Sequence, residues 1–182
     1  MPLEFTTSYT QDSLSLFRYY KSLGEAAMAQ CSDKALFTVL DPESNSIAII
    51  VKQLVGNMRS RWTSFLTTDG EKPDRNRDSE FEAPAETRVE LLEMWEAGWR
   101  CLFEAIEPLT DADLAKTITI RTEPHSVMQA ISRQLAHYSY HLGQIVFLAR
   151  YHCGDQWKTL SVPKKKSAEF NTKVARGEMS QR

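Results

Sequence analysis

The chain contains 182 residues, 42% of them hydrophobic and 25% charged, and its formal net charge is −2. These values are typical of one ordinary globular domain with a sizeable core, and the near-neutral charge argues against nucleic acid or an anionic membrane surface as a partner. No apolar segment approaches the roughly 20 residues that a membrane-spanning helix needs.

The N-terminus and the cysteines bear on the cellular compartment. The first seven residues have neither the basic start nor the apolar core of a signal peptide. Cys31, Cys101 and Cys153 are far apart and odd in number, which predicts free thiols in a reducing compartment rather than a disulfide framework. A cytoplasmic protein is therefore expected.

Four long segments carry apolar residues three and four positions apart, the spacing that gives a helix one buried face. They are Ser8–Gln30, Ser46–Phe65, Ala85–Ile106 and Ser126–His152. We expect Ser44 or Asn45 to be the N-cap of the second helix. In the third helix, Val89, Trp95 and Trp99 are expected to face the core.

The connections complete the expected architecture. Thr67–Pro84 is a long polar loop that is expected to shape an opening, and its interspersed charges indicate a solvated surface rather than a basic binding patch. Ala115–Glu123 predicts one short extended stretch. Residues 163–182 form a polar tail, expected to be mobile at its end, after a single domain at 1–162. The fold class is therefore all-α, a four-helix bundle.

The last long helix contains the main candidate for chemistry. His137 and His141 lie one turn apart beside an apolar stripe, so their rings point the same way and could hold one divalent cation. The structural alternative is a pair of core histidines whose hydrogen bonds are satisfied. No glutamate follows His137 as it does in zinc proteases, so that class is excluded.

This helix resembles the last long helix of the DinB/YfiT-like superfamily, helical bundles linked to metal-dependent chemistry. The match rests on His137, His141, Gly143, Gln144 and Ile145, and the second helix supports it. The resemblance covers about Tyr9 to Val162. It is nearest to an uncharacterised subgroup, for which no substrate is implied.

The resemblance implies a divalent metal (nickel, zinc, iron or manganese) held by one histidine from the second helix and two from the last. His137 and His141 match the last two positions, but Gln53 stands where the first histidine is expected. An amide oxygen is a poorer ligand for nickel or zinc than imidazole. Asn57 and Gln144 are expected to support the ligands.

Two other histidines are poor substitutes for the missing ligand. The separation of His125 from His137 corresponds to roughly 18 Å along a helix axis, and His152 is similarly remote from His141. An aspartate or glutamate from another helix remains an open alternative, because the sequence singles out none.

The resemblance also implies two alternative functions. In the first, the metal activates a thiolate or water for attack on a small electrophile. This covers thiol S-transfer with bacillithiol, mycothiol or glutathione, and amide hydrolysis. The substrate would lie between the second and last helices, under the Thr67–Pro84 loop. In the second, favoured by Gln53, the protein is a non-catalytic stress-related or interaction bundle that has lost tight metal binding. A homodimer is expected in both cases.

Overall fold

The computed structural model describes residues 5–82 and 85–180, and it is mostly helical with one small antiparallel sheet. Four long helices are α1 (Tyr9–Gln30), α3 (Ile47–Trp62), α4 (Arg88–Ile106) and α5 (Val127–Cys153). The remaining elements are α2 (Asp33–Phe37), η1 (Asp78–Phe81), η2 (Asp111–Asp113), β1 (Thr117–Ile120), β2 (Glu123–Ser126), η3 (Gly154–Gln156) and α6 (Ser167–Ala175). The periodicity therefore predicted all four long helices.

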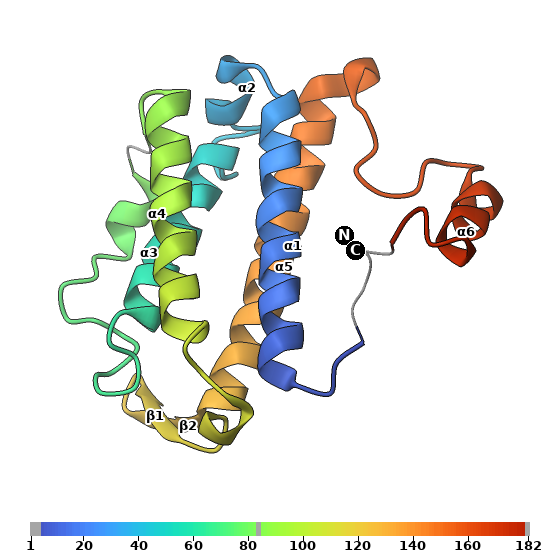
Figure 1. The fold of residues 1–182 in the computed structure, drawn as a ribbon. Coiled ribbons are helices and arrows are strands. Elements are labelled where there is room, and N and C mark those ends of the chain that lie inside the picture. The colour runs from blue at the N-terminus through green and yellow to red at the C-terminus, as the bar shows by residue number, and fades with distance from the viewer. Residues whose placement is uncertain (1–4, 83–84, 181–182) are drawn as a thin grey trace.

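The four long helices lie side by side (Figure 1). The most extensive contacts join α1 to α5 and α3 to α4, and α3 also packs on α5. Within the described residues, no helix combines the length and the apolar character that crossing a bilayer requires.

Aromatic side chains fill the centre of the core. Trp95 and Trp99 are completely buried, as predicted, and their rings meet edge to face with centroids 5.4 Å apart. Tyr138 of α5 is also fully buried, 5.9 Å from Trp99 and 5.9 Å from Phe17 of α1. Such contacts add to the burial of apolar area. They hold α5, and with it the histidine pair, at a defined position against the other helices.

Serine or threonine caps the N-terminus of each long helix, and one of these caps differs from the predicted residue. Ser8, Ser46, Thr87 and Ser126 cap α1, α3, α4 and α5, each accepting a hydrogen bond from a backbone N–H of the first turn. The expected cap of α3 was Ser44 or Asn45. Ser44 instead accepts hydrogen bonds from the backbone N–H groups of Leu40 and Asp41, closing the preceding turn.

Helix α4 begins later than predicted, and one side chain faces the other way. Its first residue is Arg88 rather than Ala85, because Thr87 and Glu90 form a capping box there. Val89 was expected to face the core, but it is 65% exposed. In the first turn the apolar stripe passes instead through the fully buried Leu91.

The stretch expected to be extended is a β-hairpin. Its strands β1 and β2 pair antiparallel, with Ile120 opposite Glu123 and Thr117 opposite Ser126. The two turn residues, Arg121 and Thr122, have φ of 54° and 66°. Both values lie in the left-handed region that side chains other than glycine, asparagine and aspartate rarely adopt. The predicted extended stretch therefore pairs with the residues that lead into α5.

The loop and the tail have more regular structure than expected. The Thr67–Pro84 loop includes the short helix η1, and its last residue, Pro84, lies outside the described residues. The tail contains α6, in which no residue is buried, and Figure 1 shows it standing to one side of the long helices. Trp157 and Leu160 pack against the core before the tail begins.

Candidate functional site

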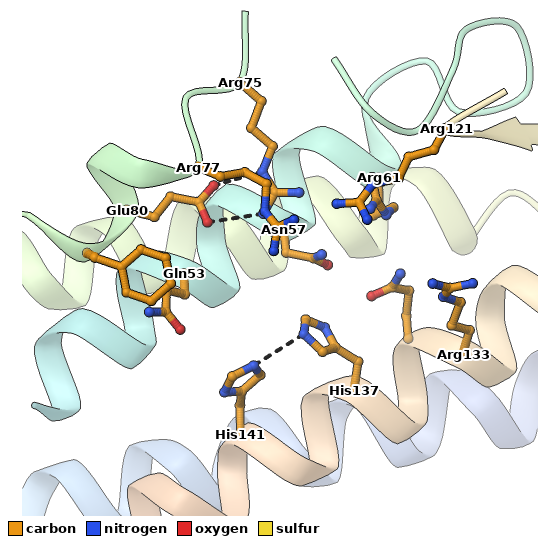
Figure 2. Close-up of a pocket in the computed structure, with 12 residues that line it drawn as sticks. Gln53, Asn57, Arg61, Arg75, Arg77, Glu80, Arg121, Arg133, His137 and His141 are labelled. Atoms are coloured by element: carbon orange, nitrogen blue, oxygen red, sulfur yellow. Dashed lines mark hydrogen bonds and ion pairs between the residues drawn. The ribbon is translucent and has the colours of Figure 1, made fainter. Parts of the chain in front are cut away.

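A pocket of about 230 Å³ lies between α3 and α5. Four parts of the chain line it: α3, the loop between α3 and α4, the tip of the hairpin, and α5. Figure 2 shows the two histidines pointing from α5 toward α3, with Gln53 and Asn57 opposite them. Four of the residues singled out from the sequence, Gln53, Asn57, His137 and His141, therefore meet in one cavity.

The two imidazole rings face each other through their Nε2 atoms, which are 3.2 Å apart. Gln144 Oε1 lies 2.8 Å from His141 Nδ1, so the amide oxygen accepts a hydrogen bond from that nitrogen. Neutral His141 then carries its proton on Nδ1 and directs the Nε2 lone pair toward His137. Gln144 thus orients a histidine without lining the pocket itself.

Both histidines are held in the neutral form. Burial, followed by the field of His141 and then by that of Arg61, Arg75 and Arg133, lowers the pKa of His137 to about 4. Burial also lowers the pKa of His141, although the hydrogen bond with Gln144 works in the opposite direction. Two neutral imidazoles are the form that a metal ion requires.

Gln53 and Asn57 differ in their hydrogen bonding. Trp62 Nε1–H donates to the Tyr138 hydroxyl over 3.1 Å, and that hydroxyl donates to Asn57 Oδ1 over 3.1 Å. Asn57 therefore bonds to the buried tyrosine rather than to a histidine. Gln53 Nε2 is buried and has no hydrogen-bond partner among the described residues, so it is free for a ligand in the pocket.

The pocket offers a metal ion two strong ligands, His137 and His141, and its described lining lacks the third histidine that the resemblance implies. Among the residues that the structure describes, no group of three or more histidine, cysteine, aspartate or glutamate side chains could hold a metal ion. His125 bonds to the Glu123 carbonyl, and neither it nor His152 lines the pocket, as their positions in the sequence predicted. On α3, the two imidazoles thus share the pocket with the amide of Gln53.

The comparisons with known proteins identify a family. Residues 4–166 match the sequence model of the family described as "Protein of unknown function (DUF1572)". The chain belongs to this family. No curated protein matches it. The expected membership of an uncharacterised group is therefore confirmed, whereas the wider kinship with DinB-like proteins remains a prediction.

In this DUF1572 protein the pocket has a basic wall that the sequence analysis did not identify. The guanidinium groups belong to Arg61 of α3, Arg75 and Arg77 of the loop, Arg121 of the hairpin turn, and Arg133 of α5. One signal was available: Arg133 precedes His137 by four residues, so the two share a helix face. No sequence spacing connects the other four arginines, because they lie on three different segments.

The loop was expected to carry only solvated charges, and Arg75 contradicts this. Its side chain is 8% exposed and binds Glu80 through two hydrogen bonds of 2.8 and 3.0 Å. Glu80 is also buried, where it lies against Gly56 of α3. The ion pair lies within the loop, and Glu80 brings this part of the loop against α3 at Gly56, so the loop forms one wall of the pocket.

The hairpin turn is held in place by one carboxylate. Asp69 accepts hydrogen bonds of 2.8 Å from the backbone N–H groups of both Arg121 and Thr122. Hydrogen bonds from backbone N–H groups, chiefly those of Glu71 and Thr122, lower the pKa of Asp69. These bonds stabilise the left-handed turn and bring the Arg121 Nε within 3.0 Å of Glu71 Oε2.

Proposed function

We propose that this protein is a DinB-like four-helix bundle that binds a divalent metal through His137 and His141 and acts on a small substrate in the adjoining pocket. The chemistry is thiol S-transfer or hydrolysis. The single observation that carries the proposal is the 3.2 Å separation of the two Nε2 atoms.

That separation suits two ligands on one metal ion. Zinc–nitrogen bonds of 2.0–2.1 Å at a tetrahedral angle place the two nitrogens about 3.3 Å apart. Gln144 selects the His141 tautomer whose Nε2 can coordinate. Burial keeps both rings neutral, so neither has to lose its positive charge before a cation binds. His137, which donates its Nε2 proton to His141, has to carry that proton on Nδ1 instead before its own Nε2 can bind a cation.

In this proposal the Gln53 amide oxygen would be the third ligand from the protein. When bound, the metal would supply a Lewis acid with positions open for a thiolate or a water. The protein's own residues shape the rest of the site. The loop covers the pocket, and Gln144 and the buried Tyr138 hold the α5 side of it in register.

A second candidate is a non-catalytic bundle that has lost tight metal binding. Two observations favour it: the amide at position 53, and the guanidinium groups around the histidines. Positive charge in the lining of the same pocket opposes the entry of a cation unless an anion enters with it. In this candidate the histidines form only hydrogen bonds, one between their Nε2 atoms and one from His141 to Gln144.

Metal content separates the two candidates. The protein, purified without chelator, is analysed for transition metals, and zinc, nickel, iron and manganese are then titrated into it. The metalloprotein proposal expects more than about one metal per ten chains and measurable uptake. Assays of the metal-loaded protein with chlorodinitrobenzene and low-molecular-weight thiols test turnover. Metal-free protein with no uptake would support the non-catalytic bundle.

The substitution Gln53→His tests where the metal binds. A third imidazole facing His137 and His141 should tighten metal binding at least about tenfold. Gln11→His, an exposed change on α1, is the matched control and should have no effect. An unchanged affinity in Q53H would show that residue 53 does not contact the metal.

We also propose that the protein works in the cytoplasm as a homodimer. Its three cysteines are free thiols, which suits a reducing compartment. Three large aromatic side chains of α5 are exposed on one face: Tyr140, Phe147 and Tyr151, each more than 60% exposed. Exposed aromatic residues grouped in this way are typical of protein interfaces.

A further inference from the structure

The basic wall of the pocket carries more positive charge than its carboxylates neutralise. Five guanidinium groups line the cavity, and Glu80 is the one carboxylate among the described lining residues. Glu71, just behind the wall, provides a second. Further back, the opposite charges of Asp69 and Lys72 offset each other. The five guanidinium groups therefore exceed the two carboxylates by about three positive charges.

The ion pairs show which arginines are already engaged. Glu71 Oε2 accepts hydrogen bonds of 3.0 Å from both Arg61 and Arg121, and its Oε1 lies 3.6 Å from Arg75. Three guanidinium groups therefore share one carboxylate, while Glu80 pairs with Arg75 and with no other cationic side chain in the described part of the chain.

Arg77 and Arg133 differ from these three. Neither guanidinium has a hydrogen bond or an ion pair with any residue in 5–82 or 85–180, and both side chains are exposed at the pocket. Figure 2 shows Arg77 on the loop side and Arg133 on α5, with the cavity between them. The unpaired charge is therefore at the entrance, where an incoming ligand meets it first.

The inner arginines are held at an energetic cost that a ligand would offset. The side chains of Arg61 and Arg75 are 7% and 8% exposed. A buried guanidinium loses most of its hydration, and sharing one carboxylate among several arginines restores only part of that free energy. Planar guanidinium groups in this setting bind carboxylate and phosphate oxygens in pairs.

Like the guanidinium groups, the uncharged amide donors at the pocket can hydrogen-bond to the oxygens of an anion. The Gln53 Nε2 amide is buried and unpartnered among the described residues. Asn57 uses Oδ1 to accept from Tyr138, which leaves its own amide hydrogens available to the cavity. A ligand rich in acceptor oxygens satisfies both amides and the arginines.

We propose that this pocket binds a small multivalent oxyanion, a phosphate monoester or a di- or tricarboxylate, between the arginines of the loop and the Arg133 face of α5. Arg75 contacts the anionic group within the pocket, and Arg77 and Arg133 attract and hold it at the entrance. The cavity of about 230 Å³ admits a molecule of that size but no macromolecule. The site depends on the basic wall alone and stands with or without a bound metal.

Calorimetric titration of the full-length protein with inorganic phosphate and with citrate tests the proposal. The protein is first stripped of metal on an immobilised chelating resin, because soluble chelators are themselves multivalent carboxylates. We expect at least one probe to bind with a Kd below about 1 mM at low ionic strength, and more weakly as salt rises. Binding of phosphate would identify the ligand as a phosphate ester, and binding of citrate would identify it as a polycarboxylate.

Two exposed, unpaired arginines provide the variants. Arg133→Gln and Arg77→Gln should each weaken binding about tenfold without loss of fold, since each removes one unpaired guanidinium. Arg150→Gln, an exposed change on the same helix but outside the pocket, is the matched control and should leave the Kd unchanged. The proposal is overturned if neither probe binds, or if R150Q weakens binding as much as R133Q does.

The outcome is independent of the metal experiments. A metal-free protein that still binds phosphate or citrate supports the anion site even if the metalloenzyme proposal fails. A protein that takes up metal but binds neither probe supports the metal site and rejects the anion site.

Discussion

Single residues determine how closely the Thr67–Pro84 loop packs on α3, and Gly56 is the clearest case. A Cβ atom built on Gly56 would lie 2.7 Å from the Glu80 carboxyl carbon, closer than van der Waals contact allows. Glu80 in turn holds Arg75, whose guanidinium forms part of the basic wall. The absence of one side chain on α3 therefore allows the loop to place an arginine over the histidines.

Gly56→Ala should destabilise the protein by about 1–3 kcal/mol, because the methyl group displaces Glu80 and leaves the buried Arg75 with only its longer contact to Glu71. Urea denaturation of the wild type and the variant measures this free energy of unfolding. Alanine otherwise favours a helix by up to about 1 kcal/mol over glycine, so the predicted sign is opposite to that of helix propensity.

Glu80→Ala provides the control for this interpretation. In an E80A background the obstructing carboxylate is absent, so adding Gly56→Ala should be neutral or stabilising. An equal cost of G56A in both backgrounds would place the clash somewhere other than at Glu80.

At the scale of the helices, two glycines differ in how closely neighbouring helices approach them. On α1, a Cβ atom at Gly24 would lie 2.7 Å from Leu142 Cδ1 of α5 and 2.8 Å from Trp95 Cη2 of α4. On α5, a Cβ atom at Gly143 would meet nothing within 4 Å. Gly24 therefore marks the close approach of three helices, whereas Gly143 faces open space.

Gly24→Ala should lower the free energy of unfolding by about 1–3 kcal/mol, because Leu142 and Trp95 are buried and have little room to move. Gly143→Ala is the matched substitution and should raise it by up to about 1 kcal/mol through helix propensity. Thermal unfolding of the two variants measures both changes. Changes of the same sign would mean that contact between the helices does not distinguish the two glycines.

At the scale of the whole molecule, the exposed aromatic face of α5 bears on how many chains associate. The face of α5 that carries Tyr140, Phe147 and Tyr151 is turned away from the core, and each of these side chains is more than 60% exposed. Burying such aromatic side chains against a second copy would remove a large apolar area from water.

We expect light scattering to give twice the 20.8 kDa mass of one chain. Phe147→Glu should weaken the dimer by about tenfold or more, because it places a charge at the centre of the aromatic face. Val89→Glu alters an equally exposed residue on α4 and should leave the mass unchanged. A monomeric wild type, or equal effects of both variants, would contradict the proposed interface.

The features that the sequence predicted well depend on neighbours along the chain. The four long helices follow from apolar spacing, and the orientation of His137 beside His141 follows from their separation of one turn. The contact of Gln144 with His141 is similarly local, three residues apart on one helix. Local geometry of this kind is the same wherever the helix lies, so the sequence alone determines it.

The remaining features depend on contacts between distant segments. Arg75 looked like one more solvated charge in a polar loop, but it is buried because it pairs with Glu80 of the same loop, which packs on Gly56 of α3. Arg121 reaches the pocket because Asp69, far earlier in the chain, stabilises the turn that carries it. The energy of a charge depends on which other charges surround it in space. Only the tertiary structure could therefore decide that the histidine pair faces a basic wall.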